Sequence, residues 1–338
     1  AFCTKTLGTK DGVSEMLGEL KRETFDKHGA FTVGEVFNIT DDDLSDFIGE
    51  NGYFSTIFDF STELLSAGEH GWYDAPDVAF PAWKKAIFHA QDQAYGCGFE
   101  SNIIENHDEP RGASRYLPVY ARNSCGTKML GTMSLLLRGL PFIFQGQEIG
   151  MTNTNWQSVD EFDDLNTVDQ YHLALKAGLS EKDALDKIGR LSRDNARTPM
   201  QWDDSDNAGF STGKPWLKIN PNYKEINVKE ALADPESVFH YMQKLIRMRK
   251  ENPVAVYGVY KEYQHDNEQL FLYERVLEEE GQKARTMYVV LNFSDHEAEF
   301  EKPEEWDGAA KYLIGNMSEA PLENRMLQPY EAAVYLKS

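Results

Sequence analysis

The sequence predicts an α/β domain built on a parallel sheet, followed by a smaller all-β domain. Short apolar strands and helices alternate four times within the first 150 residues, which is typical of βα units. Polar side chains follow several of these strands directly. After residue 252 the pattern changes to short strands separated by charged turns. We therefore expect two domains, residues 1–252 and 253–338.

The predicted parallel strands are short runs of β-branched and aromatic residues at 30–37, 53–60, 99–105 and 141–145. Amphipathic helices are expected where apolar residues recur at helical spacing, at 11–28, 80–95 and 127–137. The acidic residues 41–43 are expected to open a further helix, because the helix dipole favours negative charge in the first turn.

Residues 153–223 interrupt the alternation. This stretch is polar, with one short helical patch at 170–187, and loops of this length in a compact domain are usually functional. Trp202 and Trp216 are expected to pin the loop rather than to bind a ligand. An amphipathic helix at 237–250 then closes the first domain.

The second domain is predicted to be a small antiparallel β-sandwich. Its six strands are expected at 254–263, 270–276, 286–293, 298–300, 311–314 and 326–335.

Composition excludes several classes of protein. With 56 acidic and 34 basic residues the net charge is −22, which repels nucleic acid and anionic membranes. No apolar run is long enough to span a bilayer. The three cysteines and eight histidines show no metal-ligand spacing, so we expect no metal and no cofactor, with free thiols in a reducing cytoplasm. The first residues show neither Met nor a signal-peptide layout, so we expect a part of a longer protein.

The most informative polar cluster is Glu105-Asn106-His107-Asp108-Glu109, at the end of the third predicted strand. Chemistry in βα folds gathers where strands end and loops begin. The alternative is a helix cap provided by Asp108 or Asn106.

Four motifs occur in this order along the chain: TVGEV at 32–36, ENHDEPR at 105–111, FIFQGQEIGMTN at 142–153 and SRDNARTPMQWDDSDNAGFSTGKPW at 192–216. Together they closely resemble the α-amylase family of glycoside hydrolases, in its oligo-1,6-glucosidase and α-glucosidase branch. The resemblance implies the second half of a (β/α)8 TIM barrel, strands five to eight, followed by the family's antiparallel β-domain.

The resemblance assigns roles to the residues at the strand ends. Glu35 matches the general acid/base, and a Glu between apolar walls at a strand mouth can have its pKa raised as that role requires. Asp108 matches the carboxylate that grips sugar hydroxyls and stabilises positive charge on the ring, with His107 as its neighbour. A solvated strand-end Glu and a capping Asp are the alternatives for Glu35 and Asp108.

Other residues are candidates for binding the sugar. Arg193 and Arg197 resemble two pocket arginines of this branch, although they could be surface residues of a polar loop. Arg111 is a candidate too, with a structural salt bridge as its alternative. Phe37 and Phe60, like Phe58, could stack on a sugar ring, although core packing is the alternative for each. Three residues are expected at the rim of the fourth strand: Gln145, Gln147 and Glu148.

The resemblance implies a retaining α-glucosidase that hydrolyses terminal α-linked glucose from short oligosaccharides. The family's nucleophilic aspartate ends the fourth barrel strand, and nothing like it precedes Glu35, so we expect this chain alone to be inactive. Four strands also leave open edges, so we expect the missing N-terminal half or a second copy to complete the sheet. The alternatives are a transglycosylase, a sucrose or trehalose isomerase of the same branch, and a non-catalytic carbohydrate-binding relative.

Overall fold

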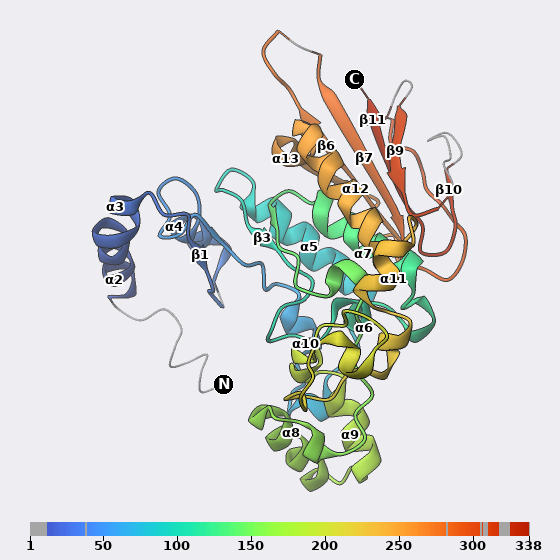
Figure 1. Ribbon diagram of the computed structural model, residues 1–338. Coiled ribbons are helices and arrows are strands. Elements are labelled where there is room, and N and C mark those ends of the chain that lie inside the picture. The colour runs from blue at the N-terminus through green and yellow to red at the C-terminus, as the bar shows by residue number, and fades with distance from the viewer. Residues whose placement is uncertain are drawn as a thin grey trace.

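The computed structural model describes residues 12–37, 39–281, 283–304, 306, 310–317 and 325–337. Cys3 and the loop at the start of the chain lie outside these residues. Figure 1 shows three parts in chain order: a helical and short-stranded segment in blue, a large helical body, and an antiparallel sheet in orange and red.

The parallel part of the structure consists of four very short strands: β1 (Val33–Gly34), β2 (Thr56–Ile57), β3 (Ser101–Asn102) and β4 (Leu140–Pro141). β1 pairs with β2 and β3 pairs with β4, both in parallel. A parallel bridge from Phe58 to Ser101 and a hydrogen bond from Asp59 N–H to the Ser101 carbonyl at 3.2 Å join β2 to β3. The four strands are therefore neighbours in chain order, as the βα pattern predicts.

Helices precede and follow these strands along the chain. The first predicted helix is formed by α2 (Val13–Leu20) and α3 (Asp26–His28), separated by a π-helical stretch at Lys21–Phe25. Phe25 contacts Phe54 and the Lys21 ammonium donates to the Gly52 carbonyl at 2.6 Å, which holds this segment beside α4 (Leu44–Phe47) and β1 in Figure 1. The helices that follow in the chain are α5 (Phe80–Ala94), α6 (Gly112–Tyr116) and α7 (Ser124–Leu136).

The polar region at 153–223 is more ordered than its sequence suggested. A helical hairpin of α8 (Leu165–Lys176) and α9 (Glu181–Gly189) replaces the single predicted patch. The two helices share a small core that contains Tyr171, Ala174, Ala184 and Ile188. Gly178, at φ 96°, lies in the turn between them, a backbone conformation that favours glycine.

Four further helices lie between this hairpin and the antiparallel sheet. They are α10 (Asp194–Arg197), α11 (Val228–Ala233), α12 (Val238–Glu251) and α13 (Pro253–Tyr257). The strand predicted at 254–263 was therefore wrong over its first residues. Pro253 occupies the first position of α13, where its missing N–H and fixed φ are tolerated.

The C-terminal sheet has five antiparallel strands in the order β5-β6-β7-β11-β9. Their bounds are β5 (Val259–Tyr263), β6 (Leu270–Leu277), β7 (Arg285–Asn292), β9 (Lys311–Gly315) and β11 (Ala332–Lys337). A two-stranded ribbon of β8 (Ala298–Glu299) and β10 (Met326–Leu327) accompanies it. The last predicted strand is divided into β10 and β11 by a turn around Tyr330, which has a φ of 56°.

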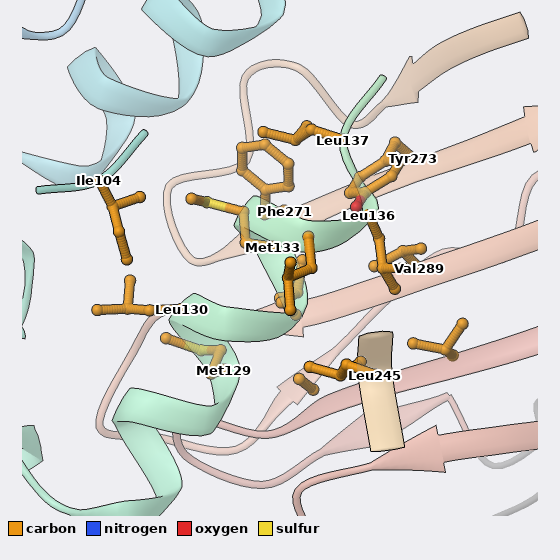
Figure 2. Close-up of a cluster of buried hydrophobic side chains, with 14 of the residues drawn as sticks. Ile104, Met129, Leu130, Met133, Leu136, Leu137, Leu245, Phe271, Tyr273 and Val289 are labelled. Carbon is orange, nitrogen blue, oxygen red and sulfur yellow. The ribbon is translucent and has the colours of Figure 1, made fainter. Parts of the chain in front are cut away.

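The main hydrophobic core joins the helical body to one face of this sheet. Figure 2 shows Leu130, Met133 and Leu136 of α7 with Leu245 of α12, Phe271 of β6 and Val289 of β7. On the opposite face of the sheet, Leu272 and Tyr288 pack with Trp306 in a second cluster that includes Ala298 of β8 and Leu327 of β10. The second layer of the expected sandwich is thus the small ribbon.

The main cluster includes side chains from both sides of residue 252. The domain boundary itself stays a prediction. Within the described ranges, no helix is long and apolar enough to cross a membrane.

Candidate active site

The strand order brings the carboxyl ends of β1, β2 and β3 to one edge of the parallel sheet. Glu35 follows β1 directly, and the polar turn that contains His107 and Asp108 follows β3. Gly34 permits the close approach at the end of β1, because a Cβ atom built there would lie 2.5 Å from the ring of Phe54. Glycine before Glu35 therefore has a packing reason.

The turn after β3 is shaped by Asn106. Its Oδ1 atom accepts a hydrogen bond from the Asp108 N–H at 2.7 Å, an Asx-type turn. The next helix, α6, begins at Gly112 with no side-chain cap. The Asp108 carboxylate instead receives arginine side chains, so the capping alternative for Asp108 is wrong.

Asp108 is the centre of a cluster of charges. Its Oδ1 atom accepts from Arg193 Nη1 at 3.2 Å and from Arg197 Nη2, and its Oδ2 atom lies 3.3 Å from Nε2 of His107. The side chain of Asp108 is 41% exposed, so it remains open to a ligand. The structure thus brings together four of the predicted site residues: His107, Asp108, Arg193 and Arg197.

Arg193 is held from its other side by Asp164. Nε of Arg193 donates to Asp164 Oδ1 at 2.8 Å, and the Asp164 side chain is only 1% exposed. The same carboxylate caps α8 by accepting from Thr167 N–H and Oγ1. Burial acts to raise the pKa of Asp164, but the hydrogen bonds from Arg193 and Thr167 and the charge of Arg193 outweigh it and hold that pKa below its usual value. The hydrogen bond to Asp164, together with Asp108, raises the pKa of Arg193.

Asp194 hydrogen-bonds to the backbone at Asp163 and Asp164. Its Oδ2 atom accepts from the N–H groups of Asp163 and Asp164 at 2.8 and 2.9 Å, and the residue is fully buried. These hydrogen bonds join the start of α8 to the start of α10. Asp164 was not singled out from the sequence, and its contact with Arg193 was missed.

Arg197 fixes the strand-end turn itself. Its Nε atom donates to the His107 carbonyl at 2.9 Å, in addition to its contact with Asp108. A planar guanidinium can make both contacts at once, which a lysine ammonium cannot match in geometry.

Arg111 has a structural role. It is fully buried, and its Nη1 atom donates to Glu105 Oε1 at 3.1 Å and to the Gln145 carbonyl at 2.7 Å. Nη2 donates to the Ala196 carbonyl at 3.2 Å. Burial raises the pKa of Glu105, with Arg111 and the Gly112 N–H opposing the shift. The proposed substrate contact is therefore replaced by the salt-bridge alternative, since no part of Arg111 reaches the surface.

The aromatic candidates pack mainly on one another. Phe37 stacks on Phe60 with ring centroids 4.5 Å apart, and Phe58 contacts both Phe60 and Phe142. Phe37 keeps 52% of its surface exposed, and Glu35 is exposed as well. Apolar walls around Glu35 are therefore not formed by the described residues.

The other residues singled out in the loops are Gln147, Glu148, Trp202 and Trp216. Gln147 and Glu148 bond to their own loop, at Phe144 N–H and Gly146 N–H respectively. Trp202 and Trp216 are 50% and 66% exposed, so neither is buried as the prediction that they pin the long loop requires. Trp156 does this instead, because it is buried and its Nε1–H donates to Asn195 Oδ1 at 2.9 Å. In the described part of the chain no group of three or more His, Cys, Asp or Glu side chains is arranged to hold a metal.

Known proteins of one family match the chain in sequence. The family model of the α-amylase catalytic domain matches residues 6–258. The oligo-1,6-glucosidases of Bacillus cereus and Parageobacillus thermoglucosidasius are 36% and 38% identical to the chain, and each match covers 96% of it. The chain spans only 58% of the length of either relative.

Two solved structures superpose closely on the chain. A trehalose-6-phosphate hydrolase from Bacillus licheniformis matches 96% of this chain and 59% of its own, with a TM-score of 0.87 and 33% identity. The trehalulose synthase MutB from Pseudomonas mesoacidophila MX-45 matches 97% and 59% of the two chains, with a TM-score of 0.87 and 32% identity. With its βα units, its C-terminal antiparallel sheet and a family model matched over most of its length, the chain belongs to the α-amylase family of glycoside hydrolases.

Proposed function

We propose that this chain is the C-terminal portion of a retaining α-glucosidase that removes terminal α-linked glucose from short oligosaccharides. In this proposal β1 to β4 are strands five to eight of a (β/α)8 barrel whose other half lies outside the chain. The observation that carries the proposal is the anchoring of Asp108 by Arg193 and Arg197 at the strand edge that also presents Glu35.

Each residue takes a role that its position supports. Glu35, exposed at the end of β1, protonates the leaving oxygen and later activates water. Asp108 accepts hydrogen bonds from sugar hydroxyls and stabilises positive charge developing on the ring. Arg193 and Arg197 hold the Asp108 carboxylate in one orientation, because both guanidinium groups donate to its Oδ1 atom.

The nucleophile of this mechanism is supplied from outside the chain. Retention requires a second carboxylate about 5–5.5 Å from the acid/base. The exposure of Glu35 supports a facing segment that completes the site, and the exposed apolar residues Phe31, Phe142 and Ile143 border the outer strands β1 and β4. We therefore propose that the N-terminal half of the barrel, or a second copy of the chain, covers these edges.

The experiment is a comparison of the chain alone with a chimera. The chimera joins to this chain the part of the Bacillus cereus oligo-1,6-glucosidase that it does not match, and hydrolysis of isomaltose is followed. The proposal expects turnover only in the chimera, and its loss in Glu35→Gln. A Glu35→Gln chimera as active as its parent would refute the assigned acid/base.

An isomerase of the same branch is the second candidate, because the trehalulose synthase MutB is as similar in structure as the hydrolase. Incubation of the chimera with sucrose separates the two. Glucose and fructose in equal amounts support hydrolysis, whereas a rearranged disaccharide supports the isomerase. The free thiols of Cys97 and Cys125 support a reducing, cytoplasmic location for either enzyme.

A further inference from the structure

A cavity of about 190 Å³ lies on the helix-facing side of the parallel strands, between β2, β3, α4 and α5. Thr56 and Ser101 hydrogen-bond to each other through their hydroxyls at 3.0 Å and so share one face of the sheet. Because side chains alternate along a strand, Ile57, Asp59 and Glu100 point to the opposite face. All three line the cavity. This cavity is therefore separate from the carboxylate at Asp108.

The cavity contains an unpaired carboxylate oxygen. Glu100 is 7% exposed, and its Oε2 atom has no hydrogen-bond partner among the described residues. Asp59, the second carboxylate, has one oxygen that accepts the Ser61 N–H at 2.9 Å. An unpartnered buried acceptor is costly, so Glu100 Oε2 is expected to find a partner from outside the chain.

The charges around Glu100 are mainly negative. Asp41 also lines the cavity, with His89 at 3.1 Å from its carboxylate. Arg138 is near Glu100, but its Nη1 atom already donates to the carbonyls of Ala94 and Gly98. Burial raises the pKa of Glu100 well above its usual value, the charge of Asp59 adds to this, and Arg138 opposes it. A positive charge in the cavity would relieve this repulsion.

The remaining walls are apolar and aromatic. Leu44, Ile57 and Ala90 form one part, and the stacked rings of Phe37 and Phe60 form another. Aromatic faces attract cations as well as hydrocarbon. The volume is far larger than one bare ion needs, and no metal-binding cluster exists among the described side chains.

We propose that this cavity binds a small organic cation, with its primary ammonium on Glu100 and Asp59 and its hydrocarbon body against Ile57, Leu44 and the two phenylalanine rings. The ammonium supplies the donor that Glu100 Oε2 lacks and can also donate to the Asp59 carboxylate. The cavity is lined by none of Glu35, Asp108, Arg193 and Arg197, so this proposal does not rest on the roles assigned to them, although it shares Phe37 and Phe60 with the sugar-stacking candidates.

The test uses cyclohexylammonium as the probe and cyclohexanol as its neutral counterpart. The full chain is titrated with each while the methyl signals of Ile57 and Ile39, both in the wall, are followed by NMR. The proposal expects saturable shifts of these methyls with the ammonium and much weaker ones with the alcohol. Equal binding of the two probes, or no shift at Ile57, would overturn it.

Variants show which carboxylate binds the ammonium probe. Glu100→Gln is expected to weaken the ammonium about tenfold or more, because a charge-assisted hydrogen bond is lost. Exposed Glu280→Gln is the matched control, and Asp108→Asn tests whether the probe binds at the other carboxylate instead. Ala90→Leu fills the cavity without changing its charge and should abolish binding. Undiminished binding in both Glu100→Gln and Ala90→Leu refutes the site.

Discussion

Nε of Arg193 lies 2.8 Å from Oδ1 of Asp164, a carboxylate that is buried and also caps α8. Arg193 is therefore held in place by a buried carboxylate where it contacts Asp108, and is not a free surface side chain. The contact explains why a long polar loop can deliver an arginine to the end of β3. It also makes Asp164 a positioning residue for the site.

The first prediction concerns the two roles of Asp164, which caps α8 and pairs with Arg193. Asp164→Asn preserves a capping side chain but loses the charge that holds Arg193, whereas Asp164→Ala loses both. Urea unfolding should therefore show a greater loss for Asp164→Ala, by about 1 kcal/mol, the usual value of a helix cap. A double-mutant cycle of Asp164→Asn with Arg193→Gln should give a coupling of about 1 kcal/mol. Additive effects would mean that the pair contributes nothing.

The second prediction separates the structural from the substrate-binding interpretation of Arg111. Arg111→Met should lower the free energy of unfolding by about 3–5 kcal/mol, because it leaves Glu105 buried without its partner. Adding Glu105→Gln should recover part of the loss. Exposed Arg247→Met is the control, with an expected change within about 0.5 kcal/mol. An Arg111→Met chain of normal stability would contradict the structural role.

The third prediction concerns a lysine that ties the helical body to the antiparallel sheet. Lys84 of α5 is fully buried and donates to the carbonyls of Gln264 and Asn267, in the turn between β5 and β6, and of Leu270 at the start of β6. Lys84→Met should cost about 2–4 kcal/mol, since buried carbonyls lose their donor. Its exposed neighbour provides the control, Lys85→Met. Equal unfolding midpoints for the two variants would show that the contact is dispensable.

The fourth prediction is a pH dependence that arises from Glu100. Because its pKa is raised, the folded state keeps a proton that the unfolded state releases once the pH exceeds the usual value of 4.5. The folded state then binds more protons, so this group makes stability fall as pH rises through that window. Glu100→Gln should therefore gain stability relative to the wild type with increasing pH. Chemical denaturation at a series of pH values measures this difference, and a flat difference, like that expected for Glu280→Gln, would contradict it.

Several elements could be predicted from the sequence for clear physical reasons. The helices at 80–94 and 238–251 bury one face, so apolar spacing identified them. Three of the four observed strands lie within the predicted runs, because their ends carry polar residues after apolar ones, although only two residues of each make ladder bonds. The fourth, Leu140–Pro141, overlaps the predicted 141–145 only at Pro141.

Long-range contacts could not be predicted in this way. The pairing of Arg193 with Asp164 joins residues 29 positions apart, and either could equally have faced solvent. The burial of Arg111 depends on carbonyls of two other segments, which no local pattern reveals. The exposure of Trp202 and Trp216 likewise contradicts an expectation based on residue type alone.

The central claim is that this chain carries the acid/base Glu35 and the anchored Asp108 but depends on another segment for the nucleophile. The most direct measurement is hydrolysis of p-nitrophenyl α-glucoside by the purified chain, with Glu35→Gln purified in parallel as the background. The account predicts equal, background-level release of p-nitrophenol from both. Turnover by the wild-type chain that Glu35→Gln lacks would contradict it, because the chain would then hold a complete catalytic site.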